Sequence, residues 1–471
     1  PDLPALAQDL DGTLVRPGEA AWKTARQLYN PRFDDLKPTA VAYVAHPDDI
    51  RTALAFARRT QTPVAVRNGG HSYTGWSSGD GRLIIDVSRL NKIAPGATAT
   101  IGAGARLIDV YRTLAAKGVT LPAGTCPSVG ITGLTLGGGH GVASRAYGLT
   151  CDSLTQATLV TADGTHLTCD DEKKSKHRDL FWALRGAGNG NFGVVTELRF
   201  RTHPAPRAVT AYLNWPWSKA RQVLTAWQQW GPDQPGEIWS ALNFAAEPGA
   251  TPTYYVTVFS LGAYDELQNA VDRLADAVGS SATRVTMERR DYLKAMELYA
   301  GCADLTDAQC RLPGPTPGRD PGGVLRRETY TSRSDFFDRS IPDTGVRALL
   351  NRLERVRGES GSSGSLLLTA LGGAVNQVDP DATAFVHRRS RVLAQYIASW
   401  KAGTSGTAVR GWLKTTHDAM RPYASGSAYQ NYPDPDLPNW RTAYYGSASS
   451  RLADLKKRYD PTRLFDFPQA L

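Results

Sequence analysis

The chain has 471 residues, of which 41% are hydrophobic and 21% are charged, and its formal net charge at neutral pH is +9. This length exceeds what one ordinary core needs, so we expect two domains, and the sequence contains no run of about 18 apolar residues that would cross a membrane. The Lys and Arg residues are spread through mixed-sign segments such as 170–178 and 451–458, which argues against a nucleic-acid partner.

Residues 1–36 predict an N-terminal helical arm, and residues 37–206 predict a domain in which strands and helices alternate. Within that domain, short β-branched runs predict strands at 40–44, 63–66, 83–87, 158–161 and 194–200. Helical periodicity predicts helices at 48–59 and 106–116.

Residues 207–423 predict a second domain with longer elements. Predicted helices at 219–230, 264–279, 343–357 and 383–401 alternate with predicted strands at 239–245, 253–261 and 365–371. This pattern predicts an antiparallel sheet backed by helices, which makes the fold class α+β. Residues 424–471 form a C-terminal segment that ends in the stretches 452–459 and 460–465.

Two glycine-containing turns carry the most informative residues. Gly69 and Gly70 follow a β-branched run, allow positive φ, and leave backbone N–H groups open to a pyrophosphate. His71 leaves this turn as a candidate nucleophile, and Cys126 lies in a second turn, 121–130, punctuated by Gly and Pro. A lone His in such a turn usually makes a local hydrogen bond, and a lone Cys is usually a small core residue. Their joint occurrence favours two tethers to one cofactor.

The segment 188–193 fits the GxGxxG pattern of dinucleotide-binding Rossmann folds. That pattern must follow a strand and open a helix, so that the helix N-terminus faces the pyrophosphate. Here a predicted helix, 179–185, precedes the glycines and a predicted strand, 194–200, follows them. We therefore reject an NAD site and expect these glycines to allow close backbone approach to another ligand.

Four motifs in order, GGHS at 69–72, CPSVG at 126–130, GNFGVVT at 190–196 and YQNY at 429–432, resemble a known family. The chain resembles the FAD-linked oxidases of the vanillyl-alcohol-oxidase superfamily, in the berberine-bridge-enzyme-like branch that includes glucooligosaccharide oxidase and aclacinomycin oxidoreductase. The resemblance covers residues 37–471. It implies a PCMH-type FAD-binding domain at 37–206, a substrate domain at 207–423, and a segment, 424–471, that returns to the FAD domain.

The resemblance implies FAD that is attached bicovalently. In that branch the histidine of the GGHS turn bonds the 8α carbon of the flavin and the cysteine of the CP[ST]VG turn bonds C6, and these positions are His71 and Cys126 here. No metal site is expected. The other residues implied to bind the cofactor are Arg67, Asn68, Gly69, Gly70, Ser72, Gly75, Val129, Gly130, Gly133, Gly138, Gly141, Gly193, Val195 and Asn431.

The tail segment 429–434 supplies the candidate base. In sugar- and alcohol-oxidising relatives a tyrosine of this motif removes the substrate hydroxyl proton, and that role falls to Tyr432, supported by Tyr429 and Asn431. A tyrosine with an ordinary pKa of about 10 is a poor base at neutral pH and needs a nearby cation. The alternative is that both tyrosines only pack. Asp434 and Asp436 would raise a tyrosine pKa if they were close, so we expect them to face solvent.

His140 departs from the family pattern. Carbohydrate-oxidising relatives usually carry a second active-site tyrosine fourteen residues after the cysteine, and this chain has His140 there. A histidine titrates near neutrality and can serve as a base or substrate ligand, or it can simply hydrogen-bond a carbonyl group. Val129 matches the small residue of relatives that use O2, so the resemblance favours an oxidase over a dehydrogenase.

The resemblance implies an oxidase that takes a hydride from a hydroxyl or hemiacetal carbon of a sugar or glycosylated natural product and reduces O2 to H2O2. Two alternatives stay open: a tailoring oxidase that oxidises C–N bonds or cyclises a natural product, and a drug-binding resistance flavoprotein. The expected partners are a small molecule and O2, with no nucleic acid or membrane, and the expected state is a monomer or homodimer. Five tryptophans are candidates either to stack substrate rings or to fill a core: Trp215, Trp217, Trp227, Trp230 and Trp239.

Four cysteines remain once Cys126 is assigned to the flavin: Cys151, Cys169, Cys302 and Cys310. They would form two disulfides in an oxidising compartment, or stay reduced and inert. The sequence starts at Pro1 without a methionine, as in a processed precursor or a shortened chain. We expect secretion from a bacterium, with the cytoplasm as the alternative location.

Overall fold

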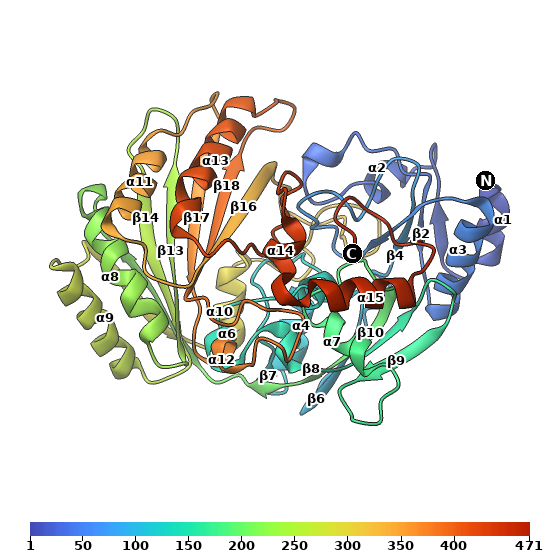
Figure 1. Ribbon diagram of the computed structural model, residues 1–471, viewed down its shortest axis with the longest axis horizontal. Coiled ribbons are helices and arrows are strands. Elements are labelled where there is room, and N and C mark those ends of the chain that lie inside the picture. Colours follow the sequence, from blue (N-terminus) through green and yellow to red (C-terminus); the bar gives the residue numbers. More distant parts are fainter.

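A computed structural model describes residues 1–471, and two domains lie side by side along its longest axis (Figure 1). The first domain contains a four-stranded sheet in the order β1-β2-β4-β3. Its strands are β1 (Thr13–Val15), β2 (Ala40–Tyr43), β3 (Val64–Arg67) and β4 (Leu83–Asp86). Strands β2, β4 and β3 are parallel, and helix α3 (Pro47–Thr60) links β2 to β3. Their largely apolar, buried residues fit a parallel sheet that is covered on both faces.

A second, antiparallel sheet of the first domain has the order β5-β6-β10-β8-β9. It consists of β5 (Ile93–Ala94), β6 (Thr98–Gly102), β8 (Leu154–Val160), β9 (His166–Asp170) and β10 (Val194–Arg201). Four helices accompany it: α4 (Leu107–Ala115), α5 (Ile131–Leu136), α6 (Ser144–Tyr147) and α7 (Arg178–Leu184). A two-stranded ribbon of β7 (Val119–Thr120) and β11 (His203–Pro204) completes the domain.

The second domain is an antiparallel sheet of seven strands in the order β15-β12-β14-β13-β17-β18-β16. The strands are β12 (Ala208–Asn214), β13 (Ile238–Ala246), β14 (Thr253–Ser260), β15 (Arg284–Arg290), β16 (Tyr330–Phe337), β17 (Ser363–Ala370) and β18 (Val392–Ser399). One face is covered by α8 (Ala220–Asp233), α9 (Tyr264–Val278), α11 (Asp343–Glu354) and α13 (Thr407–Met420) (Figure 1). The predicted sheet backed by helices, and with it the α+β class, is confirmed. Two further helices, α10 (Tyr292–Tyr299) and α12 (Ala374–Gln377), lie between the domains.

The predicted helix at 383–401 is wrong. The chain runs irregularly to Arg391 and then forms β18, which pairs with both β16 and β17. Most of β18 is buried, so its apolar residues show no strict alternation, and a short apolar run of this kind does not separate helix from strand. Pairing with two strands from distant parts of the sequence decides its conformation.

The N-terminal residues 1–36 are not the predicted helical arm. Only α1 (Leu3–Asp9) and the short α2 (Trp22–Ala25) are α-helical, and β1 lies between them. Strand β1 pairs antiparallel with β2, which buries Leu14 and Val15 at the edge of the first sheet. The segment is therefore an integral part of the first domain.

One of the two possible disulfides is present. Cys302 and Cys310 are bonded within the irregular segment between α10 and β16. Cys151 and Cys169 are separate, buried thiols: Cys169 lies opposite Ala157 in the β8–β9 hairpin, and Cys151 precedes β8 in a 3-10 turn. None of the helices combines the length and apolar character that spanning a bilayer requires.

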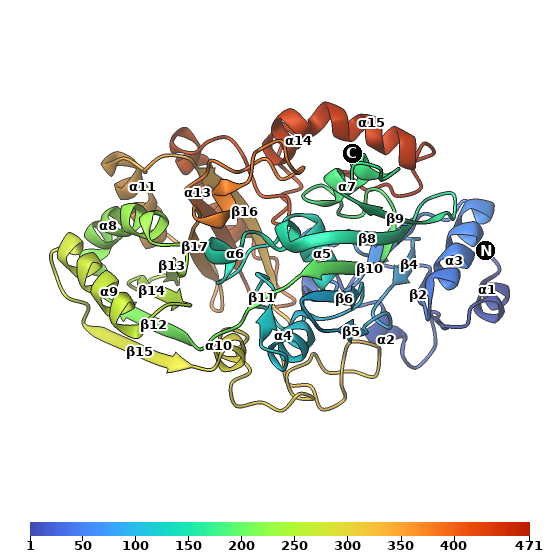
Figure 2. The ribbon, with the colours of Figure 1, turned by 90° about the horizontal axis from the view of Figure 1, so that it is seen from below.

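The C-terminal segment returns to the first domain. Helices α14 (Trp440–Tyr445) and α15 (Ser449–Tyr459) run along it, and α15 lies beside α7 (Figure 2). The buried Lys456 ammonium donates hydrogen bonds to the backbone oxygens of Asn191 and Phe465 and pairs with Asp460 at 2.8 Å. The backbone N–H of Leu471 donates to the Asn191 side chain. The tail thus holds the loop 188–193 from outside.

Arg145 fixes the two domains to each other. It lies on α6 of the first domain and is 1% exposed. Its guanidinium donates to four backbone oxygens of the second domain, at Pro232, Gln234, Ile238 and Leu371. Because these carbonyl groups end α8, begin β13 and follow β17, one side chain ties together several elements of the neighbouring domain.

Candidate active site

A cavity of about 1340 Å³ lies between the two domains and is lined by residues from both of them and from the tail. Its volume exceeds the roughly 300–1,000 Å³ typical of a drug-sized ligand site, so it has room for a dinucleotide and a second molecule. On the side of the first domain the wall consists mainly of loops that follow β3, α4 and α7. On the opposite side the wall is the uncovered face of the seven-stranded sheet.

The two predicted tether turns pack directly on each other. Gly70 has a φ of +70°, which reverses the chain after β3. A Cβ atom on Gly69 would lie 2.6 Å from the Gly130 nitrogen and 2.7 Å from the Ser128 oxygen, so only glycine allows this approach. The amide of Asn68 donates to the Ala103 oxygen at 2.6 Å and fixes the turn from behind. The glycines therefore serve mainly to bring His71 and Cys126 to the same wall.

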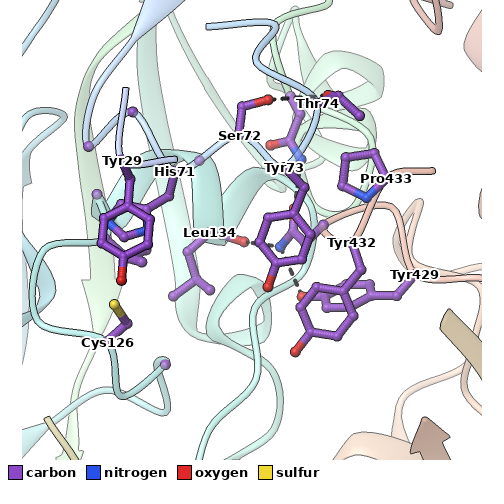
Figure 3. Close-up of a pocket in the computed structure, with 18 of the residues that line it drawn as sticks. Tyr29, His71, Ser72, Tyr73, Thr74, Cys126, Leu134, Tyr429, Tyr432 and Pro433 are labelled. Carbon is purple, nitrogen blue, oxygen red and sulfur yellow. Dashed lines mark hydrogen bonds between the residues drawn. The ribbon is translucent and has the colours of Figure 1, made fainter. Parts of the chain in front are cut away.

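His71 and Cys126 lie together on one side of the cavity (Figure 3). The His71 ring stacks on Tyr29 with 4.0 Å between ring centroids, and its Nε2 atom lies 2.8 Å from the Ser128 hydroxyl. Burial, with a smaller effect of Arg106, lowers the His71 pKa to about 3, so the imidazole is neutral at physiological pH. Burial raises the Cys126 pKa, and hydrogen bonds from Ser128 oppose that rise.

Most residues predicted to bind the cofactor line this cavity, and two do not. Gly75 has a φ of +75° and a Cβ atom there would meet the Phe33 ring, while Gly138 has a φ of +119° and faces the Phe385 ring in the same way. Both positions need glycine for packing of a turn and lie outside the cavity wall. The predicted residues that line it are Arg67, Asn68, Gly69, Gly70, His71, Ser72, Cys126, Val129, Gly130, Gly133, Gly141, Gly193, Val195 and Asn431.

The loop 188–193 also lines the cavity, through Asn189, Gly190, Asn191 and Gly193. It follows α7 and precedes β10, the reverse of the order that a Rossmann site requires. Gly193 has a φ of +158°, and a Cβ atom there would lie 2.5 Å from the Val160 oxygen. The prediction of a glycine loop that permits close backbone approach, without a Rossmann helix, agrees with this arrangement.

The polar lining of the cavity fits a flavin dinucleotide. Six buried side-chain atoms of lining residues have no hydrogen-bond partner in the chain: Arg67 Nη1, Ser77 Oγ, Asn189 Oδ1, Thr257 Oγ1, Thr329 Oγ1 and Gln469 Oε1. Buried polar atoms in folded proteins are nearly always hydrogen-bonded, so such a cluster is typical of a site that binds a large polar ligand. Donors and acceptors are both present, as the ribityl, phosphate and ring groups of FAD require.

Tyr432 and His140 face each other across the interface between tail and first domain. His140 Nε2 lies 2.7 Å from the Tyr432 hydroxyl oxygen, and neither side chain makes another hydrogen bond. Tyr429 packs edge-on against Tyr432, with 4.7 Å between ring centroids. The Tyr429 hydroxyl accepts hydrogen bonds from the Gly139 N–H and the Asn431 amide, both at 2.9 Å. Tyr429 therefore holds the segment 429–432 in place, and His140 is the hydrogen-bond partner of the Tyr432 hydroxyl.

Burial controls the protonation of this pair. It lowers the His140 pKa to about 4, and burial together with Tyr73 and Tyr429 raises the Tyr432 pKa well above its ordinary value. The cation that the sequence analysis required beside Tyr432 is not found. At neutral pH both groups are uncharged, so a neutral imidazole is the one side chain positioned to accept the Tyr432 proton.

The expectation that Asp434 faces solvent is wrong. Asp434 is 5% exposed, its carboxylate lies 3.5 Å from the Arg333 guanidinium, and its N–H donates to the Tyr444 hydroxyl. Burial raises its pKa. This ion pair anchors the turn that follows Tyr432 to β16. Asp436, in contrast, is exposed at the edge of the same turn.

Sequence reasoning missed several residues around the pair. Tyr73 stacks on Tyr432 with 5.3 Å between ring centroids, and its hydroxyl accepts a hydrogen bond from Gln395 at 2.9 Å. Tyr330 meets Tyr73 edge-on. The position of Tyr73, two residues after His71, was a usable signal, whereas Gln395 and Tyr330 reach the site only through the order of strands in the second domain.

Of the five singled-out tryptophans, only Trp239 lines the cavity. Trp215, Trp227 and Trp230 are buried among the helices and strands of the second domain, and Trp217 packs against that core. The interpretation as core residues is correct for these four. Trp400, at the end of β18, lines the cavity and was not singled out.

Comparisons with known proteins agree with this site. A family model described as "FAD binding domain" matches residues 38–170, and one described as "Berberine and berberine like" matches residues 428–471. An uncharacterized FAD-linked oxidoreductase of Bacillus subtilis, YgaK, is 32% identical over 98% of this chain and 97% of its own length. A chitooligosaccharide oxidase of Gibberella zeae is 30% identical over 96% of this chain and 91% of its own. The structure of Physcomitrella patens BBE-like 1 matches with a TM-score of 0.88 and 29% identity, covering 100% of this chain and 99% of that one.

Proposed function

Because the chain belongs to the berberine-bridge-enzyme-like family of FAD-linked oxidoreductases, we propose that it oxidises a hydroxyl or hemiacetal carbon of a sugar or glycosylated natural product. FAD, when bound, accepts the hydride at N5, and O2 is reduced to H2O2. The observation that carries this proposal is the hydrogen bond between Tyr432 and His140 in the wall of the cavity.

The Tyr432–His140 pair supports proton removal from a hydroxyl group. A neutral phenol is not a base, but it can take the substrate proton as its own proton moves to His140 Nε2. The imidazole begins neutral because burial lowers its pKa to about 4. Both residues thus share the role of base: Tyr432 contacts the substrate, and His140 receives the proton.

The packed turns around His71 and Cys126 support a bicovalent flavin. Both side chains line one wall of the cavity, and the Gly69–Gly130 contact holds their turns together. His71 is a neutral imidazole and is therefore able to act as a nucleophile. We propose that His71 bonds the 8α carbon and Cys126 bonds C6, which prevents loss of the cofactor.

The sheet face opposite the flavin wall supports a polyhydroxylated substrate. Cavity-lining residues recur at every second position, for example Ser363, Ser365, Leu367 and Thr369 on β17, as the strand period requires. The side chains of Asn243, Ser365 and Thr369 line the cavity and form no hydrogen bond within the chain. Free hydroxyl and amide groups of this kind suit the hydroxyl groups of a sugar.

The same face supports a substrate longer than one ring. In the strand register, Gln395 lies beside Leu367, Leu367 beside Asn243, and Asn243 beside Tyr255. Three strand spacings of about 4.8 Å place Tyr255 roughly 14 Å from Gln395, which bonds Tyr73 next to Tyr432. Tyr255 is 39% exposed and lies next to Tyr212, so it offers a ring to a distal part of the substrate.

The aromatic walls also favour a second candidate, a tailoring oxidase for a polycyclic natural product. Tyr73, Tyr330 and Trp239 present ring surfaces to the cavity, and such surfaces bind polycyclic compounds as well as sugars. A third candidate is a flavoprotein that binds such a compound without turning it over.

The deciding experiment mixes the oxidised holoenzyme anaerobically with cellobiose, xylobiose, chitobiose and an anthracycline glycoside, and follows flavin bleaching. Bleaching by a sugar, with release of H2O2 when air is admitted, supports the proposal. Bleaching by the anthracycline alone supports the tailoring oxidase, and a perturbed flavin spectrum without bleaching supports a binding protein. Flavin that separates from the acid-denatured protein would refute the proposed tethers.

We also propose that the enzyme is secreted. The Cys302–Cys310 disulfide supports an oxidising compartment. A comparison of enzyme activity in the medium and in the cells of the producing organism tests this, and activity confined to the cells would contradict it.

A further inference from the structure

The hydroxyl group of Ser128 lies between the two proposed tethers. Ser128 belongs to the same turn as Cys126, is 8% exposed, and has its Oγ atom 2.8 Å from His71 Nε2. It also acts on the thiol, because hydrogen bonds from its N–H and its hydroxyl lower the Cys126 pKa against the effect of burial. One small residue is thus hydrogen-bonded to His71 and also lowers the pKa of Cys126 against the effect of burial.

Nε2 of His71 is occupied by Ser128, so Nδ1 is the ring nitrogen that is free to bond the flavin, and to do so it must carry the lone pair. A hydroxyl donates one hydrogen bond and accepts up to two, and the thiolate, which is the reactive form of Cys126, only accepts. If Ser128 donates to Cys126 Sγ, it must accept from His71, and the imidazole proton then lies on Nε2. The lone pair of the neutral ring is consequently on Nδ1.

The surroundings of His71 keep the ring in this state. Tyr29 covers one face of the imidazole at 4.0 Å between centroids, so the ring cannot rotate freely. Arg106 is the charged group that acts on it, and the like charge opposes protonation. The Arg106 guanidinium is itself held by Asn68 and Ser88 and offers no acceptor to the imidazole. Ser128 is therefore the one side chain that hydrogen-bonds to the ring.

We propose that Ser128 is the positioning residue for covalent flavin attachment. Its hydroxyl accepts a hydrogen bond from His71 Nε2 and donates one to Cys126 Sγ, so that Nδ1 and the sulfur are the atoms that bond the flavin. This inference rests on the tethers proposed above.

The chemistry balances at each tether. Nδ1 of His71 bonds to the 8α carbon, which loses one hydrogen as a proton, while the Nε2 proton leaves through Ser128. The sulfur of Cys126 bonds to C6, which also loses a proton, and the thiol proton leaves as well. Each new bond therefore releases two protons and two electrons. The electrons pass to the flavin and then to O2, which forms H2O2 with the protons. Without the hydroxyl of Ser128, the alkylated imidazole would remain a buried cation, which is costly.

The test compares covalent attachment in the wild type, Ser128→Ala and Ser128→Thr. Each protein is purified with FAD and incubated in air, and the flavin that stays on the chain after denaturation is followed by in-gel fluorescence and peptide mass. Because a positioned proton acceptor contributes about 10²-fold or more, we expect Ser128→Ala to attach flavin at least roughly tenfold more slowly, and Ser128→Thr to restore the rate. Ser363→Ala, a cavity serine on the sheet side, is the matched control and should attach flavin as the wild type does.

The outcomes separate the inference from the function on which it rests. Attachment in Ser128→Ala at the wild-type rate would overturn the role of Ser128 and leave the tethers intact. A wild type that releases all its flavin would overturn the tethers, and the role of Ser128 with them.

If Ser128→Ala fails to fold, the tautomer of His71 in the wild type tests the proposal instead. Nitrogen-15 NMR of the histidine-labelled, flavin-free wild type, with His71→Gln to assign the signal, should show the proton on Nε2. A proton on Nδ1 would overturn the proposal.

Discussion

His140 Nε2 lies 2.7 Å from the Tyr432 hydroxyl oxygen, although the two residues are 292 positions apart in the chain. His140 follows α5 in the first domain, and Tyr432 lies in the tail that returns from the second. The proposed base therefore lies at the interface between the tail and the first domain, and its geometry depends on the position of the tail. The ion pair of Asp434 with Arg333 and the hydrogen bonds of Tyr429 to Gly139 and Asn431 fix that position.

Replacing Tyr432 with Phe should lower kcat/KM for the oxidised substrate by about 10²–10⁴-fold, the usual contribution of a positioned acid–base group. The flavin content and spectrum should stay unchanged. Tyr429→Phe is the matched comparison, since it removes a hydroxyl that bonds only Gly139 and Asn431, and it should cost less than about tenfold. Stopped-flow flavin reduction measures both. Equal losses in the two variants would contradict the assignment of Tyr432.

The pH profile should follow His140. Its pKa is lowered to about 4, and only the neutral imidazole can accept a proton, so activity is retained above that value and lost as pH falls through it. We expect kcat/KM to be nearly flat from pH 6 to pH 8, and His140→Gln to lose activity across that range. A decline centred near the ordinary histidine pKa of about 6.5 would contradict the lowered pKa, and a fully active His140→Gln variant would show that His140 is not the acceptor.

We expect Tyr255 to determine how KM depends on the chain length of the substrate. Replacing Tyr255 with Ala should raise KM for cellotriose by roughly fivefold to tenfold, because aromatic stacking contributes about 0.5–1.5 kcal/mol, and should leave kcat and the KM for glucose unchanged. Tyr255→Phe keeps the ring and should behave as the wild type. Val285→Ala, an exposed apolar position on β15 outside the cavity, controls for a general effect on the sheet. An equal rise in KM for glucose and cellotriose would argue against a distal ring contact.

Acid should destabilise the protein partly through buried histidines. His140 and His387 have pKa values lowered to about 4 by burial, whereas unfolded histidine titrates near 6.5. The unfolded state therefore binds more protons between these values, and the free energy of unfolding falls as pH drops from about 6.5 to about 4, by on the order of 2–3 kcal/mol for each residue.

His387→Gln tests this, since His387 lies outside the cavity wall and bonds Gln430. Its Tm should decline less steeply between pH 7 and pH 4 than that of the wild type. His46→Gln is the control, because Asp11 raises the pKa of this more exposed residue, and it should not flatten the decline. Parallel curves for His387→Gln and the wild type would refute the contribution of His387.

The sequence predicted those parts of the fold and site that depend on local patterns. The β–α alternation of the first domain and the helices that back the second domain follow from short-range periodicity, and the GGHS, CPSVG and YQNY motifs lie in the cavity wall. Strand β18 was missed because its apolar run fits either conformation, and only its pairing with β16 and β17 resolves the choice.

Tertiary relationships account for the remaining errors at the site. Asp434 was expected in solvent because its partner, Arg333, comes from a strand about a hundred residues earlier. Ser128 was read as part of a motif, and only the structure places its hydroxyl against His71. Likewise, Gly75 and Gly138 look like ligand-contacting glycines, but the rings that require them, Phe33 and Phe385, are remote in sequence.

The bonds of Arg145 to Pro232, Gln234, Ile238 and Leu371 have a practical consequence for ligand discovery. Pulling the domains apart would strip a buried guanidinium of four fixed acceptors at once, and only water would replace them. We therefore expect the two domains to keep their relative orientation while compounds enter and leave the cavity. Crystals should survive soaking with substrates and inhibitors, and a rigid receptor is the right starting point for computational screening.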